Sequence, residues 1–313
     1  MASLYISYKI LLRNSISINL FEMNTKTALL VIYNHRFDRN IERVRKLYEG
    51  RFSHIFHIMP FYDGDDSCVI PVYDTSYCFS GYIAQAYCQL RTKGFTHFFV
   101  VADDMILNPS INEHSIWEEL GIGYQDCYID ELVCFQHHEK KRWWRRIIDA
   151  LDYTPNQLGV ELKGILPDKE EAQRRFDKHN LPYSPIPRKE LLRNPRKKDF
   201  LKMLTRSCEL KYPLVRAYSD ILLLPADVMP KFANYCGAFS ATRLFVELAV
   251  PTAMVLAADN IKTADDIKLR PGAMWTDEDM KILASYDQSL QKLLNNYPSD
   301  KLYLHPIKLS QWK

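Results

Sequence analysis

The architecture of this chain follows from the segment Thr96-His-Phe-Phe-Val-Val-Ala-Asp-Asp104, an apolar run that ends in two adjacent carboxylates. Such a run, without polar alternation, predicts a strand buried on both faces of a parallel sheet. Comparable runs occupy residues 27–33 and 54–62. Between the three runs, residues 40–48 and 82–91 have the apolar spacing of helices. This alternation predicts an α/β protein with a Rossmann-like, mostly parallel sheet flanked by helices.

Composition places the chain among packed globular proteins. Of its 313 residues, 47% are hydrophobic and 25% are charged, which excludes a disordered chain. The net charge of +3 gives no indication of a nucleic-acid binder. No apolar run reaches the length of a membrane-spanning helix. The seven cysteines form no CxxC pair, which argues against a disulfide framework and predicts a cytoplasmic protein with reduced thiols.

The charged residues are distributed unevenly along the chain, which the small overall net charge does not reveal. Residues 139–211 contain 19 Lys and Arg against 11 Asp and Glu, a net of +8, so the rest of the chain has a net of −5. We interpret this part as a mostly helical, basic insertion on the working side of the sheet. The predicted organisation is listed in chain order: an N-terminal extension at 1–26, a Rossmann-like half at 27–138, the basic helical insertion at 139–215, and a second half with a C-terminal tail at 216–313.

Chemistry is expected where the predicted strands end, because ligands of open α/β sheets bind at the carboxyl ends of the strands. Asp103 and Asp104 occupy that position after the third strand. Two carboxylates there form a hard-oxygen site suited to Mg²⁺ or Mn²⁺. The alternative is a polar turn that caps the strand. An adjacent pair at His137 and His138 is not expected to bind one metal ion, because neighbouring side chains point in different directions.

The strand and its acidic pair, followed by an apolar pair and Asn-Pro, resemble the metal-binding DxD region of GT-A glycosyltransferases, with Ala102 at the first acidic position. The resemblance covers residues 27–110 and, more loosely, 216–258. It implies a nucleotide-binding half that abuts a mixed acceptor half, and Mn²⁺ or Mg²⁺ on Asp103 and Asp104. It also implies transfer from a nucleotide-diphosphate sugar to a saccharide or lipid-linked acceptor, in bacterial polysaccharide or glycoconjugate synthesis.

The resemblance also implies a nucleoside site after the first strand. Tyr33 would stack on the base, Asn34 would contact its edge, and Arg36 would meet phosphate. Asp63, after the second strand, would bond the base or the ribose, and Asp103 would lie against the donor. The alternatives are that Tyr33 is a buried strand end, that Arg36 is a solvated loop residue, and that Asp63 belongs to an ordinary acidic turn.

Two carboxylates compete for the role of catalytic base. Asp220 precedes a predicted strand, and Glu247 lies in a predicted continuous helix at 239–250 that Pro251 would end or kink. Burial in an apolar helix would raise the pKa of Glu247 towards that of a general base. The simpler explanation is an ion pair with Arg243, four residues earlier.

The C-terminal tail supplies the last predicted site residues. By resemblance, His305 would bind the metal and Lys308 would contact the pyrophosphate. A lone His before Pro is otherwise a surface or packing residue. The tail is predicted as a short strand after an amphipathic helix at 276–294.

Other classes of function stay open at this point. The first is a catalytically inactive GT-A-like protein that binds a nucleotide or a sugar. The second is a nucleic-acid-associated protein that uses the basic insertion, although no recognition motif is present and nucleic acid is the less expected partner. The Arg and Trp cluster at 142–146 suits an anionic membrane surface, which would allow peripheral contact at the inner face of a membrane, or the pyrophosphate of a lipid-linked acceptor. It also suits single-stranded nucleic acid, and the alternative is a solvated helix face.

Overall fold

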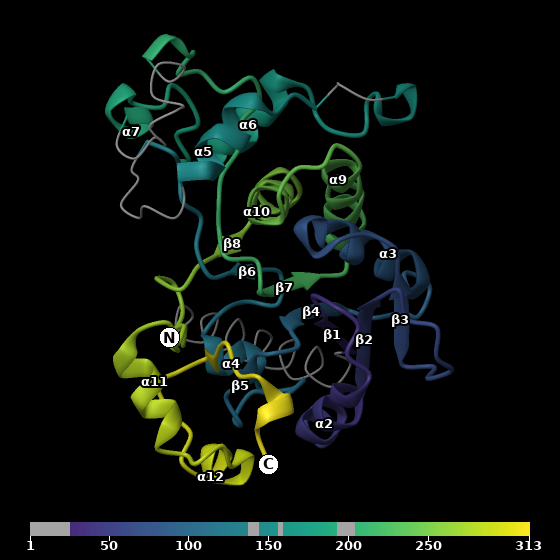
Figure 1. Ribbon diagram of the computed structural model, residues 1–313. Helices are drawn as coiled ribbons and strands as arrows, with labels where there is room; N and C mark the ends of the chain where they lie inside the picture. Colours follow the sequence, from purple (N-terminus) through teal and green to yellow (C-terminus); the bar gives the residue numbers. More distant parts are fainter. Residues whose placement is uncertain (1–25, 137–143, 156–158, 193–203) are drawn as a thin grey trace, which may run out of the picture.

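The computed structural model of the chain describes residues 26–136, 144–155, 159–192 and 204–313. A central sheet of seven strands has helices on both faces (Figure 1). The sequence prediction of an α/β protein with a mostly parallel mixed sheet is therefore confirmed. The His137-His138 pair lies outside the described residues.

The central sheet has the order β3-β2-β1-β4-β7-β6-β8. Its strands are β1 (Thr27–Ile32), β2 (His54–Pro60), β3 (Val69–Val72), β4 (His97–Ala102), β6 (Cys127–Ile129), β7 (Ile221–Pro225) and β8 (Ile261–Lys262). Strands β3, β2, β1 and β4 are mutually parallel. Strand β7 is antiparallel to both of its neighbours, and β6 and β8 are parallel to each other. Four parallel strands thus adjoin a mixed part of the sheet.

Helices cover the two faces of the sheet in separate groups (Figure 1). One face is covered by α3 (Ser80–Leu90), α9 (Met229–Ala241) and α10 (Val246–Ala257). The other face carries α2 (Arg39–Tyr48) and α4 (Ile116–Leu120), with α11 (Asp277–Ala284) and α12 (Leu290–Asn295) beyond them. The basic insertion contains α5 (Trp144–Asp152), α6 (Lys169–Lys178) and α7 (Arg188–Leu192).

The uninterrupted apolar sequence of β1 is explained by burial on both faces. Ala28 and Leu30 belong to the core beneath α3 and α9, whereas Leu29 and Val31 belong to the core on the opposite face. All four side chains are buried. Because successive side chains of a strand point to opposite faces, a strand with two covered faces favours apolar residues at successive positions.

The predicted helix at 239–250 is wrong, because the chain breaks there into two helices. Helix α9 ends at Ala241 and α10 begins at Val246, with Arg243 between them at φ 60°. Pro251 lies inside α10 rather than at its end. A proline has no N–H for the carbonyl four residues earlier. That carbonyl, of Glu247, instead accepts a hydrogen bond from the Ala217 N–H at 3.0 Å.

The predicted helix at 276–294 is also divided. Helices α11 and α12 are separated by a turn in which Asp287 and Gln288 have φ values of 52° and 55°. Two successive residues in the left-handed region end a right-handed helix. The second helix therefore starts anew, with the Ser289 side chain accepting a hydrogen bond from the Lys292 N–H.

The insertion leaves and rejoins the core at one place. Val133 and Arg216 exchange backbone hydrogen bonds of 2.8 and 3.1 Å on either side of it. The described helices of the insertion form a layer outside α10, with α6 packed on α10 (Figure 1).

A second, two-stranded sheet joins the tail to the acidic loop. Strand β5 (Ile106–Leu107) pairs antiparallel with β9 (Tyr303–Leu304), and a short 3-10 helix, η5 (Leu309–Gln311), follows. The predicted short strand in the tail is therefore confirmed. Among the described helices, none combines the length and apolar character needed to cross a membrane.

Candidate functional site

A cavity of about 220 Å³, called the first cavity below, lies at the carboxyl ends of β1 and β4. This is the edge at which ligands of open α/β sheets bind. Seven of the residues that line it carry polar or aromatic side chains used below: Asn34, Phe79, Asp103, Asp104, Asp220, Trp275 and His305.

The carboxylate of Asp104 and the imidazole of His305 meet in the first cavity. The Asp104 Oδ1 lies 3.0 Å from the His305 Nε2. The backbone fixes this contact, because the Ile307 N–H donates to the Asp104 carbonyl at 2.6 Å and the His305 N–H donates to the Gly272 carbonyl at 3.0 Å. The indole of Trp275 packs edge-on against the His305 ring, with centroids 5.7 Å apart.

The neighbouring carboxylate, Asp103, faces a different partner. Its Oδ2 accepts a hydrogen bond from the Asn40 amide of α2 at 3.4 Å, and its N–H donates to the Ile32 carbonyl at 3.0 Å. Burial, and next the charge of Asp104, raise the pKa of Asp103 to about 7. Both carboxylates line the cavity, but only Asp104 faces His305.

The titratable groups of the first cavity shift one another's pKa values. Burial favours the neutral form of His305, but the hydrogen bond to Asp104 and the charge of Asp220 outweigh it and raise the His305 pKa. Burial is also the main cause of the raised pKa of Asp220, to which the charge of Asp104 adds. A carboxyl with a raised pKa in a cavity is suited to accept a proton at neutral pH.

The donor atoms of this site fit a divalent cation only in part. Within the described residues, no group of three or more His, Cys, Asp or Glu side chains is arranged to hold a metal ion. Asp104 and His305 offer one oxygen and one nitrogen. Mg²⁺ is commonly bound by one or two carboxylates together with substrate phosphates. The pair therefore offers only part of the ligand set that Mn²⁺ or Mg²⁺ needs.

The residues expected to hold a nucleoside are separated by the structure. Asn34 lines the first cavity. Tyr33 is fully buried, and its hydroxyl bonds the His57 Nδ1 at 3.0 Å. Its ring is not presented to a ligand, so the prediction that Tyr33 stacks on a base is wrong and the alternative of a buried strand end holds.

Arg36 and Asp63 lie together outside the first cavity. Their side chains form an ion pair of 2.6 Å, and Arg36 also pairs with Asp38 at 2.8 Å. Both side chains are exposed, by 38% and 80% respectively. Neither lines the first cavity, so the alternatives of a solvated arginine and an ordinary acidic turn describe them in this structure.

Of the remaining predicted residues, one lines the first cavity and two lie outside its lining. Asp220 lines the first cavity, whereas Glu247 lies in the first turn of α10 and Lys308 is exposed before η5, both outside the lining. Arg243, the residue predicted to pair with Glu247, forms an ion pair of 2.8 Å with Asp74.

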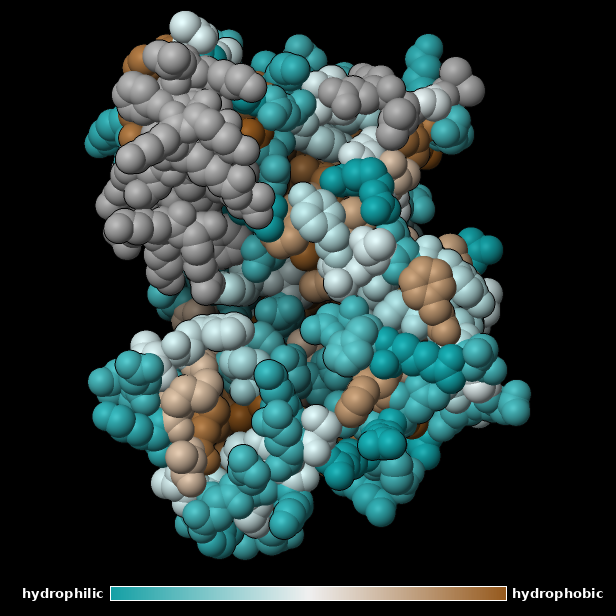
Figure 2. Space-filling model, in the orientation of Figure 1, coloured by the Kyte–Doolittle hydropathy of each residue, from teal (hydrophilic) through white to brown (hydrophobic). Residues whose placement is uncertain are grey.

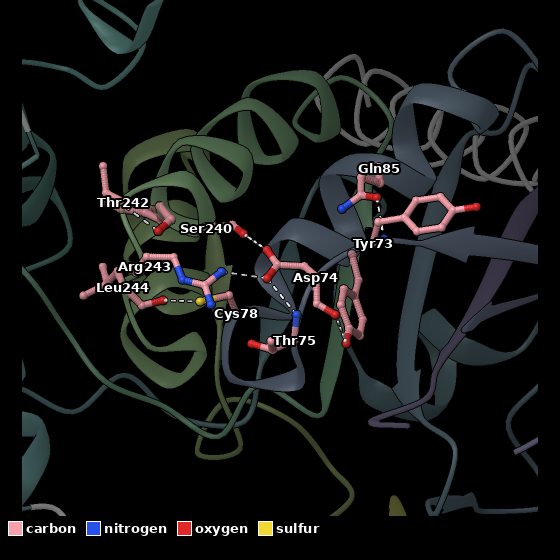
Figure 3. A network of polar contacts seen from close by, with 11 residues as sticks. Tyr73, Asp74, Thr75, Cys78, Gln85, Ser240, Thr242, Arg243 and Leu244 are labelled. Atoms are coloured by element: carbon pink, nitrogen blue, oxygen red, sulfur yellow. Dashed lines mark hydrogen bonds and ion pairs between the residues drawn. The ribbon is translucent and has the colours of Figure 1, made fainter. Parts of the chain in front are cut away.

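Asp74 lies at the centre of a network of polar contacts between the loop after β3 and the segment around Arg243 (Figure 3). Its carboxylate accepts hydrogen bonds from the Ser240 hydroxyl at 2.5 Å and from the Thr75 N–H at 2.7 Å, besides the contact with Arg243. The loop after β3 is thereby joined to the break between α9 and α10. The same loop carries Phe79 into the wall of the first cavity.

The Arg and Trp cluster at 142–146 is described only from Trp144 onward. The guanidinium carbon of Arg146 lies 3.3 Å from the ring centroid of Phe245, and Arg146 pairs with Asp149 at 2.6 Å. These contacts engage Arg146 within the fold. Its predicted role at a membrane or a pyrophosphate stays a prediction.

Sequence reasoning did not identify Asn40, Trp275 or Asp130. Asp130 directly follows the buried strand β6, as Asp103 follows β4, so the same signal was present there. Its carboxylate accepts hydrogen bonds from the hydroxyls of Tyr128, at 2.7 Å, and Tyr303. Burial raises the Asp130 pKa to about 6, and Asp220 adds to the shift.

Comparison with known proteins leaves the chain without an assigned family. No protein-family model matches the sequence, and no curated protein matches it significantly.

Proposed function

We propose that this protein is a GT-A-like glycosyltransferase that moves a sugar from a nucleotide-diphosphate donor to an acceptor hydroxyl. The contact between Asp104 and His305 carries the proposal. It joins the acidic loop after β4 to the tail, at the edge of the sheet where nucleotides bind. The two residues are distant in sequence and were both expected at a metal-diphosphate site.

The arrangement of the sheet supports the same proposal. The four parallel strands β3, β2, β1 and β4 provide a Rossmann-like half, and the adjoining strands β7, β6 and β8 form a mixed half. The first cavity is lined from both halves, by Asn34 after β1 and by Asp220 before β7. A donor bound on one half and an acceptor bound on the other would meet in this cavity.

Asp220 is the base in the proposed transfer. The acceptor hydroxyl oxygen forms a bond to the anomeric carbon of the sugar as the bond from that carbon to the diphosphate oxygen breaks. The electron pair of the broken bond leaves with the nucleoside diphosphate, and the hydroxyl proton passes to the Asp220 carboxylate. Because Asp220 lines the cavity and Glu247 does not, Asp220 is the better placed of the two candidates.

Asp104 and His305 are the residues that would hold a divalent cation, and Asp103 lines the same cavity beside them. A bound Mn²⁺ or Mg²⁺ would supply positive charge that stabilises the departing nucleoside diphosphate. The tail strand β9 keeps His305 in place by pairing with β5.

Thermal unfolding with UDP, GDP, CDP and ADP, each with and without Mn²⁺, tests whether the protein binds a nucleoside diphosphate. A ligand that binds only the folded state raises the unfolding temperature. A metal-dependent rise with one of the four diphosphates is expected. If none of them raises the unfolding temperature, the proposal fails.

Turnover separates a transferase from an inactive nucleotide-binding protein. Release of the nucleoside diphosphate from the corresponding nucleotide sugar is measured for the wild type and for Asp220→Asn. The variant should bind the donor as the wild type does and lose turnover by about a hundredfold or more, as expected when a general base is removed. Wild-type binding without any turnover would favour the inactive alternative.

A further inference from the structure

One strongly exposed aromatic side chain lies in the lining of the first cavity. Trp275 is 54% exposed, and among the described residues it is the only large hydrophobic side chain with such exposure that lines this cavity. The face of the molecule drawn in Figure 2 is mainly hydrophilic, with apolar residues scattered over its described part. An aromatic ring that opens to a cavity, rather than to a core, is accessible to a ligand.

The backbone that carries Trp275 is fixed on both sides. The Trp275 N–H donates a hydrogen bond at 3.1 Å to the carboxylate of Asp279, which belongs to the capping box at the start of α11. On the other side, the Gly272 carbonyl accepts from the His305 N–H at 3.0 Å. Gly272 also lies so close to the tail that a side-chain carbon there would collide with the Tyr303 carbonyl oxygen. The indole is therefore held in the cavity lining by the folded backbone and needs no ligand to place it there.

The contact with His305 leaves part of the indole uncovered. The two rings meet at 85°, with centroids 5.7 Å apart. Because the rings are perpendicular, His305 covers at most one of the two faces of the indole. The exposure of Trp275 is consistent with an open face. A flat ligand can stack on that face without displacing the imidazole.

The indole and the proposed base belong to neighbouring segments of the chain. Asp220 and Trp275 both line the first cavity. Two residues earlier in each segment, Tyr218 and Ala273 both line a second cavity, of about 400 Å³. The two segments thus border the same two cavities. An acceptor whose hydroxyl reaches Asp220 shares the first cavity with the indole.

The chemistry of the lining matches a sugar ring. The carboxylates of Asp103, Asp104 and Asp220 accept hydrogen bonds from hydroxyl groups. The face of an indole is electron-rich, and it attracts the weakly positive C–H groups on the face of a pyranose. A pyranose carries hydroxyls around its edge and C–H groups on its faces. An open-chain alcohol has the hydroxyls and lacks the flat C–H face.

We propose that Trp275 binds the acceptor, and that the acceptor is a pyranose whose ring stacks on the indole with one hydroxyl directed to Asp220. This inference rests on the proposed glycosyltransferase function, and it names the substrate class of the acceptor and the residue that selects it. Stacking places the acceptor in the same cavity as the base, so no chain segment separates the hydroxyl from the carboxylate.

Binding of simple probes to the full chain, without nucleotide, tests the inference. The methyl pyranosides of glucose and galactose are compared with sorbitol, an open-chain polyol, by saturation-transfer NMR. At least one pyranoside should bind, and sorbitol should bind at least about tenfold more weakly, a difference comparable to the loss of one stacking contact. The C–H protons on the stacked face of the bound pyranoside should shift upfield, because they lie over an aromatic ring.

Variants assign the binding to Trp275. Trp275→Leu keeps an apolar side chain without a ring, and it should weaken pyranoside binding by about tenfold or more and abolish the upfield shift. Trp275→Phe retains an aromatic ring and should retain part of the binding. The matched control is Tyr73→Leu, which removes an aromatic ring that is 65% exposed and lies outside the first cavity. Unchanged binding in Trp275→Leu, or an equal loss in Tyr73→Leu, would overturn the assignment.

Nucleotide binding, measured by thermal unfolding on the same preparations, reports on the proposed function separately. The metal-dependent shift with a nucleoside diphosphate should persist in Trp275→Leu. Loss of that shift with unchanged pyranoside binding would mean that the indole serves the nucleotide, which contradicts the inference.

Two further results on the wild type contradict the inference: no binding of either pyranoside, or equal binding of pyranosides and sorbitol. If the nucleotide shift is present, either result overturns only the inference about the acceptor. Pyranoside binding without any nucleotide shift overturns the proposed function, and with it the role of the bound sugar as acceptor.

Discussion

The Oδ1 of Asp104 lies 3.0 Å from the Nε2 of His305, although the two residues belong to distant parts of the chain. The contact depends on the tail, because the Ile307 N–H bonds the Asp104 carbonyl. The side chain of Asp104 remains 30% exposed. A residue in this position is available to a ligand and contributes little to the core.

Replacement of Asp104 by Asn should therefore separate binding from stability. We expect the Mn²⁺-dependent shift of the unfolding temperature with a nucleoside diphosphate to disappear. The free energy of unfolding without ligand should fall by only about 1 kcal/mol, the usual contribution of one hydrogen bond. Asp177→Asn, on the exposed surface of α6, is the matched control and should leave the shift intact. An undiminished shift in Asp104→Asn would remove this residue from the site.

Tyr33→Phe tests the buried position of the tyrosine. The change removes the hydroxyl that bonds His57 and leaves the imidazole without that partner. The expected loss is about 1–2 kcal/mol in the free energy of unfolding, measured by chemical denaturation. Nucleotide affinity should be unchanged, because the ring does not line the first cavity. A large loss of affinity with an unchanged stability would instead show that the Tyr33 hydroxyl contacts the nucleotide.

Asp74→Asn tests the loop that carries Phe79. The variant loses the charge that binds Arg243 and weakens the hydrogen bond with the buried Ser240. We expect the free energy of unfolding to fall by about 1–3 kcal/mol, because the buried Ser240 hydroxyl is left with a weaker hydrogen-bond acceptor. Donor affinity should fall with it, as the wall of the first cavity becomes less ordered. A variant with wild-type stability would show that this network does not hold the loop.

Asp130→Asn tests the raised pKa of a buried carboxyl. Because the folded-state pKa is about 6 and the ordinary value is 3.8, the folded protein holds this proton more tightly than the unfolded chain. In the wild type, protonated Asp130 therefore stabilises the folded state at low pH, and this stabilisation is lost as the pH rises through about 6. The amide cannot ionise, so the variant should gain about 3 kcal/mol relative to the wild type between about pH 4 and pH 7.

The measurement for Asp130→Asn is chemical denaturation of both proteins over that pH range. The difference between the two free energies of unfolding isolates Asp130 from the other carboxylates. A difference that does not change with pH would mean that the folded-state pKa of Asp130 is not raised.

Periodicity predicted the central strands because their environment is simple. β1 and β4 are covered on both faces, so nearly all of their positions are apolar, and this pattern is visible in one segment. The same uniform pattern does not indicate in which direction a side chain at the end of a strand points. The sequence does not distinguish a tyrosine at the mouth of a site from one that points into a core. For Tyr33 it therefore left both a stacking role and a buried strand end open, and the structure shows the buried one.

Contacts between distant segments explain the predictions that failed at α9 and α10. Arg243 forms an ion pair with Asp74, which lies after β3. The Glu247 carbonyl is engaged by Ala217, so Pro251 is accommodated within a helix. The spacing of residues within one segment predicts neither of these interactions. By contrast, the expectation that Asp104 and His305 belong to one site came from the resemblance to GT-A glycosyltransferases and not from local spacing, and the two side chains do meet in the structure.

The pairing of β5 with β9 also has a kinetic consequence. Formation of a contact between segments so far apart requires closure of a very long loop, and such contacts form slowly compared with local ones. The parallel strands β1, β2 and β4 come from one contiguous part of the chain and do not need the tail. We expect the sheet to be formed before Asp104 meets His305. Recovery of nucleotide binding during refolding would then lag behind recovery of secondary structure.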